Sequence, residues 1–205
     1  MLDPARTCLL LFDLLEGHVD KDAESRARFA PVLANARRLL EAARRHRAMI
    51  AYAHADHRPG TSARTLRDTD NRLHPIDPAD PRSHEPLLRG GTSATRIVAE
   101  LAPRDGELLV PKLRWSAFHG TALDTALRAR AVGAIVLAGG STDVGIASTA
   151  FAARDLDYNV VIVSDACTSP ERDNHDQMMA RVFPRMARVR TTAQVIDMLD
   201  RGGKG

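Results

Sequence analysis

The chain has 205 residues, of which 44% are hydrophobic and 27% charged, a balance typical of one globular domain and unlike that of a disordered chain. The 29 lysines and arginines exceed the 26 aspartates and glutamates by only three and are spread along the sequence, so we expect no nucleic-acid partner. No apolar run reaches the roughly 18 residues of a membrane span, and Asp13 and Glu16 flank the first apolar run in a way unlike a signal peptide. We therefore expect a cytoplasmic protein with a single domain over residues 1–205 and no membrane partner.

Short apolar runs alternate with longer helical patterns, as in βαβ units that build a buried parallel sheet. The predicted strands cover residues 7–12, 49–54, 107–111, 134–139, 159–165 and 187–190. The predicted helices cover residues 24–47, 93–102, 121–131, 143–156, 173–186 and 192–200. This order predicts an α/β fold, a three-layer α/β/α, Rossmann-like doubly wound sheet of six mostly parallel strands in the order 3-2-1-4-5-6.

Local patterns refine these elements. The helix over 24–47 has apolar residues at three- and four-residue spacing and arginines such as Arg37 and Arg44 on its other face, which we interpret as a solvated face. Thr191 followed by Gln194 has the spacing of a capping box. Residues 55–92 form a long polar segment with five prolines, which we expect to close over a site or to contact a partner subunit.

Two parts of the predicted sheet converge on one crevice. In a doubly wound sheet of this order, the first and fourth strands are neighbours whose helices leave on opposite faces, so a crevice opens at their carboxyl ends. Asp13 directly follows the first strand, and residues 139–145 connect the fourth strand to its helix. A carboxyl group in such a place is suited to general acid or base catalysis. A helix cap or turn residue is the alternative interpretation of Asp13.

The connection after the fourth strand is rich in glycine. It contains Gly139, Gly140 and Gly145 but neither a lysine nor a GxGxxG pattern, so it does not indicate a nucleotide site. Glycine in the first turn of a helix costs about 1 kcal/mol relative to alanine. Either a ligand approaches the backbone N–H groups around Gly145, or the helix packs tightly on the sheet.

Lys112 closes the third strand and so lies at the same edge of the sheet as Asp13, where the two groups would form a paired acid and cation. Trp115 and Phe118 follow Lys112 and either wall a pocket or pack in the core.

Other chemistries find little support. His54, Asp56 and His57 are metal-ligand types, but the adjacent Asp and His point in different directions, so we expect no metal. The only two cysteines, Cys8 and Cys167, lie in or just after apolar runs, and we interpret both as small buried hydrophobes.

Three segments, in this order and spacing, resemble the isochorismatase-like hydrolases, also called the cysteine hydrolase superfamily. They are LLLFDLLEG, RIVAELAPRDGELLVPKLRWSAFHGTALDTALRARAVGAIVLAGG and STDVGIASTAFAARDLDYNVVIVSDACTS, and the middle one is particularly similar to true isochorismatases. Most of that family hydrolyses amides through a thioester with a triad of Asp, Lys and Cys. The resemblance places Asp13 and Lys112 at the first two positions and Gly145 at the position of the nucleophile. Without a thiol the turn cannot form a covalent acyl intermediate.

Isochorismatases of this fold also carry glycine at that position. In them a protonated Asp donates a proton to the vinyl ether methylene of the substrate, water attacks the oxocarbenium carbon, and pyruvate is released. The resemblance implies that Asp13 is this general acid and that Lys112 binds a substrate carboxylate or positions water. It also implies an anion site at the amides around Gly145.

The resemblance further implies a cis peptide bond between Gly140 and Ser141, as part of the anion hole. Arg89 and Arg114 are candidate partners of a substrate carboxylate by residue type. We expect a small-molecule substrate, no cofactor, no metal and, because family members commonly form dimers or larger assemblies, a homo-oligomer.

Three functions stay open on the sequence. The leading one is an isochorismatase-type hydrolase of a small acidic enol ether. The others are an amide or ester hydrolase in which Asp13 activates water directly, and a non-catalytic small-molecule-binding member of the family. The fold cannot choose among them, because function depends on the site.

Overall fold

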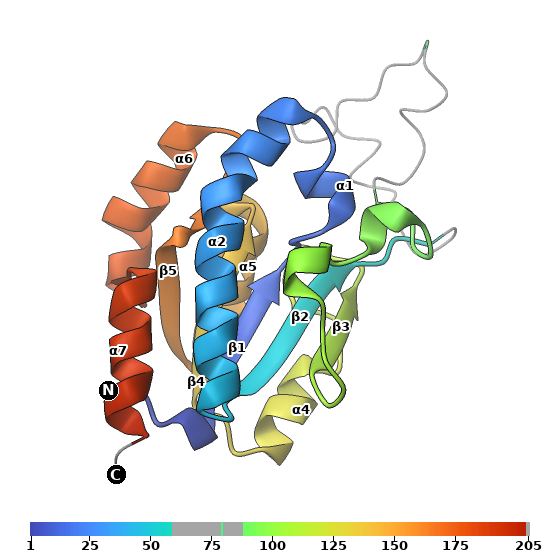
Figure 1. The fold of residues 1–205 in the computed structure, drawn as a ribbon. Coiled ribbons are helices and arrows are strands. Elements are labelled where there is room, and N and C mark those ends of the chain that lie inside the picture. Colours follow the sequence, from blue (N-terminus) through green and yellow to red (C-terminus); the bar gives the residue numbers. More distant parts are fainter. Residues whose placement is uncertain (59–78, 80–87, 204–205) are drawn as a thin grey trace.

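The computed structural model of the protein describes residues 1–58, 79 and 88–203. Six parallel strands form one sheet in the order β3-β2-β1-β4-β5-β6, with helices on both faces (Figure 1). The strands are β1 (Thr7–Phe12), β2 (Met49–Ala55), β3 (Leu108–Lys112), β4 (Ala134–Gly140), β5 (Asn159–Thr168) and β6 (Arg188–Arg190). The helices are α1 (Glu16–Val19), α2 (Ala23–Arg45), α4 (Leu123–Ala129), α5 (Ala147–Asp155), α6 (Arg172–Gln177) and α7 (Thr192–Gly202). The predicted fold class and strand order are confirmed.

The central strand β1 divides the core into two layers. All six of its residues are buried, as expected of a parallel strand that is covered on both faces. Leu9 and Leu11 join a cluster with residues of α2 and α7, whereas Leu10 and Phe12 join a cluster with residues of α4 and α5. Phe12, the last residue of β1, therefore faces the α5 side of the sheet.

The predicted helix over 93–102 is wrong. Two 3₁₀ turns, Ser93–Thr95 and Ala99–Leu101, take its place. The backbone of this segment bonds to the chain after β1: the Val98 N–H donates to Leu14 O (3.1 Å), and the Glu16 N–H donates to Arg96 O (2.9 Å). These long-range bonds compete with a continuous helix.

The predicted helix over 173–186 is interrupted. It consists of α6, a π-helical turn (Met178–Val182) and a 3₁₀ turn (Phe183–Arg185). Pro184 lies in the 3₁₀ turn, and proline lacks the N–H that an α-helix requires there. Buried Phe183 anchors this end of the segment in the core.

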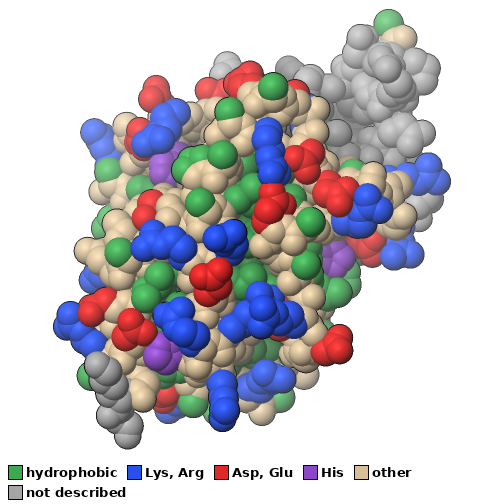
Figure 2. All heavy atoms as spheres, in the orientation of Figure 1, with side chains coloured by type: hydrophobic (Ala, Val, Ile, Leu, Met, Phe, Trp, Pro, Cys, Tyr) green, Lys and Arg blue, Asp and Glu red, His purple; other side chains and the backbone are tan. Residues whose placement is uncertain are grey.

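The solvated face predicted for α2 holds for Arg37 but not for Arg44, whose side chain is only 18% exposed, and both arginines form ion pairs. Arg44 Nε lies 2.7 Å from Glu107 Oε1, and Arg37 Nε lies 3.5 Å from Glu41 Oε1. Figure 2 shows basic and acidic side chains interspersed on the face that includes α2 and α7. Within the described residues, no helix is both long and apolar enough to cross a membrane.

Candidate active site

The carboxyl ends of β1, β2 and β3 bring the predicted acid and cation together. Asp13 follows β1, Lys112 ends β3, and Ala55 of β2 pairs with Lys112 in the sheet. The Asp13 N–H donates to Ala53 O (2.9 Å), which extends the strand ladder by one residue. At Asp13 the chain then turns, with φ of 49°, a left-handed conformation that aspartate tolerates better than most residues.

Asp13 and Lys112 form a buried ion pair. Lys112 Nζ donates to Asp13 Oδ2 at 2.7 Å, and the other carboxylate oxygen accepts from the Ala55 N–H at 2.9 Å. The Lys112 side chain is only 5% exposed, and the Asp13 side chain only 10%. Because little water reaches the pair, each charge depends on the other for compensation.

The connection from β4 to α5 lies beside this pair. Phe12 and Gly139 are partners in the sheet, so Asp13 and Gly140 follow at neighbouring positions. The Gly140–Ser141 peptide bond is cis, where the resemblance places it. A π-helical turn, Thr142–Ile146, follows and leads into α5. The first amides of a helix have no carbonyl acceptor within it, so this turn offers N–H groups at the edge of the sheet.

A carboxylate in the turn is held by three side chains. Asp143 accepts hydrogen bonds from Ser141 Oγ, from Ser169 Oγ (2.6 Å) and from Asn174 Nδ2 (2.7 Å). Burial raises the pKa of Asp143, but the hydrogen bonds from Ser141, Ser169 and Asn174 outweigh it, so the pKa is lowered from its ordinary value. Asp143 is therefore a carboxylate that fixes the turn.

A second contact joins the same turn to α6. Thr142 Oγ1 lies 2.9 Å from His175 Nδ1, and both residues are buried. Burial lowers the pKa of His175, so the imidazole is neutral near pH 7. The sequence patterns described above do not indicate Ser169, Asn174 or His175 as residues of the site. Their position after β5, the neighbour of β4, is the signal that places them at this edge.

Gly145 is buried against Phe12. A Cβ atom at Gly145 would lie 2.7 Å from Phe12 Cζ and nearer still to Cε1. The sequence left open whether a ligand or tight packing requires this glycine, and the structure supplies the packing reason. The same ring lies under Lys112, whose Nζ is 4.4 Å from the ring centroid.

The two aromatic residues after β3 differ in their surroundings. Trp115 is 45% exposed. Phe118 stacks on Tyr158 with ring centroids 5.8 Å apart. Tyr158 directly precedes β5 and so lies at the amino ends of the strands, whereas Asp13 lies at their carboxyl ends. The ring contact favours core packing over a pocket wall for Phe118.

The candidate arginines lie on the segments around the site. The Arg114 guanidinium donates to Leu113 O at 2.8 Å. Arg89 is exposed and pairs with His57 in a short parallel bridge, so the chain returns at Arg89 to the end of β2. Most of residues 55–92, predicted to form a lid or a subunit contact, lies outside the described residues.

The charge of Asp13 affects the pKa of two nearby histidines, His54 and His18. Burial lowers the pKa of His54 and of His18, while the charge of Asp13 opposes the shift in both. The Nδ1 atom of His54 is buried and has no hydrogen-bond partner among the described residues. Among the residues that the structure describes, no three His, Cys, Asp or Glu side chains are arranged to hold a metal ion.

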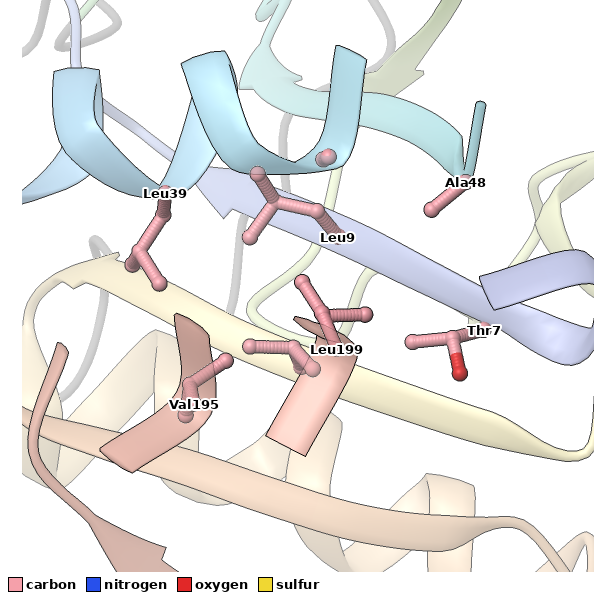
Figure 3. Close-up of a pocket in the computed structure, with 8 residues that line it drawn as sticks. Thr7, Leu9, Leu39, Ala48, Val195 and Leu199 are labelled. Carbon is pink, nitrogen blue, oxygen red and sulfur yellow. The ribbon is translucent and has the colours of Figure 1, made fainter. Parts of the chain in front are cut away.

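The hollow drawn in Figure 3 is a separate feature. It lies between β1, β4, α2 and α7, and its lining includes Leu9, Leu39 and Leu199, with Thr7 as the one polar residue. It contains no titratable group, so the candidate active site remains the carboxyl edge of the sheet.

Comparisons with known proteins agree with this fold. Residues 7–194 match the model of the isochorismatase domain. The chain is 29% identical to the isochorismatase family protein YwoC of Bacillus subtilis over 202 residues, 97% of this chain and 96% of that protein. It is 28% identical to the ureidoacrylate amidohydrolase RutB of Rhizobium rhizogenes over 186 residues, 80% of this chain and 71% of that protein.

A solved structure shows the same architecture. The cysteine hydrolase from Pseudomonas syringae superimposes with a TM-score of 0.85 at 25% identity, covering 98% of this chain and 95% of that one. Six parallel strands in this order with flanking helices match the α/β fold of the isochorismatase-like hydrolases. The chain belongs to the isochorismatase family.

Proposed function

We propose that this chain is a hydrolase of the isochorismatase type that needs no nucleophilic side chain. Asp13 protonates the vinyl ether methylene of a small acidic substrate, water attacks the resulting carbon cation, and pyruvate is released. The observation that carries the proposal is the combination of an intact Asp13–Lys112 pair with a position 145 that has no room for a thiol side chain.

Each step has a residue to perform it. The double bond takes the proton of Asp13 to form a methyl group, and the positive charge that develops on the adjacent carbon is shared with the ether oxygen. Water adds to that carbon, its proton returns to Asp13, and the adduct collapses to pyruvate and an alcohol. General acid catalysis of this kind contributes about 10²- to 10⁴-fold to a rate.

Lys112 connects substrate binding to the protonation of Asp13. In the proposed reaction a carboxylate of the substrate takes over the Lys112 ammonium. The Asp13 carboxyl group then lies buried without its cation, and burial favours the protonated form that the first step needs. The amides of the turn at Gly140 and Ser141 are candidate contacts for the rest of the substrate. Further candidates are Arg89, which pairs with His57 after β2, and Arg114 and Trp115, which follow Lys112 in the chain. A cytoplasmic location and a homo-oligomer stay predictions.

The identity of the products tests this proposal. Purified protein is incubated with isochorismate and, separately, with a panel of small amides, and pyruvate is detected with lactate dehydrogenase and ammonia by a coupled assay. We expect pyruvate from the enol ether and no ammonia. Asp13→Asn should abolish pyruvate release, whereas Asp105→Asn, in an exposed turn away from the site, should retain it. Pyruvate release that persists in Asp13→Asn overturns the assignment.

A second candidate is hydrolysis of an amide by water that Asp13 activates as a base. The similarity to a ureidoacrylate amidohydrolase favours it. It predicts ammonia from the amide panel and again a loss of activity in Asp13→Asn. A protein that only binds its ligand would show thermal stabilisation by that ligand without turnover.

A further inference from the structure

The side chain of Phe12 lies between two residues of the site. Phe12 is the last residue of β1, directly before Asp13, and is 1% exposed. Three atoms of its ring lie against Gly145, and Lys112 Nζ lies over the ring at 4.4 Å from the centroid. The Phe12 ring therefore contacts both the turn at Gly145 and Lys112, the cation that is paired with Asp13.

The contact with Gly145 excludes any larger side chain while the ring keeps its position. A Cβ atom there would lie 2.7 Å from Phe12 Cζ and 3.1 Å from Cδ1, and atoms so close must move apart. The backbone of Gly145 is not in the left-handed region, so the contact with the ring, and not the backbone conformation, accounts for the glycine. Gly133 is a matched contrast, because a Cβ atom there would meet only Arg6 Nη2, at 3.9 Å.

The contact with Lys112 stabilises a buried ammonium. The Lys112 side chain is 5% exposed, so water compensates little of its charge. One N–H donates to Asp13 Oδ2, and the ring face supplies further electrostatic attraction at a distance where cation–π interactions are effective. An aliphatic side chain at position 12 would fill similar volume without this attraction.

We propose that Phe12 is a positioning residue: its ring edge occupies the space that a side chain at position 145 would need, and its ring face holds the Lys112 ammonium against Asp13. The inference rests on the proposed function, in which Lys112 passes from Asp13 to a substrate carboxylate. It also implies that a thiol introduced by Gly145→Cys alone displaces the ring and disturbs the ion pair.

A thermal double-mutant cycle tests whether the Phe12 ring occupies the space beside position 145, and it requires no activity assay. We expect Gly145→Ala to lower Tm by about 5 °C, because overpacking a core is destabilising. In a Phe12→Val background, where the ring is gone, the same substitution should no longer lower Tm, because only the gain of replacing a helical glycine by alanine remains. Gly133→Ala is the control and should leave Tm unchanged. An equal effect of Gly145→Ala in both backgrounds refutes the contact.

Lysine labelling tests whether the ring face holds the Lys112 ammonium, and it also requires no activity assay. The protein is treated with a water-soluble acylating reagent, and modification of Lys112 is followed by mass spectrometry with exposed Lys21 as internal reference. Phe12→Leu keeps apolar bulk but removes the ring face, so we expect Lys112 to react at least about threefold faster. Unchanged labelling of Lys112 shows that the ring merely fills space.

Activity measurements separate this inference from the proposed function. If the ring face holds the Lys112 ammonium in place, Phe12→Leu lowers kcat/KM for pyruvate release while the protein stays folded, and an unchanged kcat/KM refutes the positioning role. A wild type that passes the thermal and labelling tests but releases no pyruvate refutes the proposed function and leaves the placement of the ring supported.

Discussion

Removing the cation of the buried pair should destabilise the fold far more than removing both charges. In Lys112→Met the Asp13 carboxylate keeps, among the described residues, only the hydrogen bond from the Ala55 N–H. Breaking a buried pair from one side costs about 3–5 kcal/mol, because a buried charge is left without compensation. In Asp13→Asn/Lys112→Met no such charge remains, so we expect a cost within about 1.5 kcal/mol of wild type. The Asn amide oxygen can still accept from Ala55.

Equilibrium unfolding in urea at pH 7 measures these differences as shifts in the midpoint. The Arg172–Asp176 pair, 3.0 Å apart with side chains 82% and 54% exposed, is the control, and its coupling should not exceed about 0.5 kcal/mol. Equal costs for the single Lys112 variant and the double variant would refute the reasoning.

Three further results follow from the structure. Gly139→Ala should cost more than about 3 kcal/mol, since its φ is 132° and a Cβ atom would collide with the carbonyl of Phe12, and near-normal Tm would contradict this. Thr191→Ala should lower the free energy of unfolding by about 1 kcal/mol through loss of the capping box, with an unchanged urea midpoint as the opposing result. Burial lowers the pKa of His175, so the unfolded chain binds the proton more tightly; stability from this residue is present above about pH 6.5 and is lost as the pH falls below that value. Stability curves against pH should therefore be flatter just below about pH 6.5 in His175→Leu than in wild type, and identical slopes would contradict a lowered pKa for His175.

The sequence predicts the acid and the cation because each directly follows or ends an apolar strand. Strand order then fixes that Asp13 and Lys112 meet at one edge of the sheet. No side-chain packing has to be known for that step. The cis bond at Gly140–Ser141 and the interpretation of Gly145 came instead from resemblance to a family, because nothing in local residue spacing indicates either.

Contacts between distant segments explain what the sequence could not predict. Asp143 is held by Asn174, which lies 31 positions away in α6, and no periodicity encodes that distance. The segment around Val98 looks helical, yet it pairs with the chain after β1. The space beside Gly145 depends on the direction of one ring, that of Phe12, and only the folded chain shows it.

The most direct test of the account is the rate of pyruvate release from isochorismate by wild type and by Asp13→Asn, at a temperature where both are folded. The account predicts turnover by the wild type and a decrease of at least about 100-fold in the variant. Equal rates in the two proteins would show that Asp13 is not the acid and would contradict the proposed mechanism.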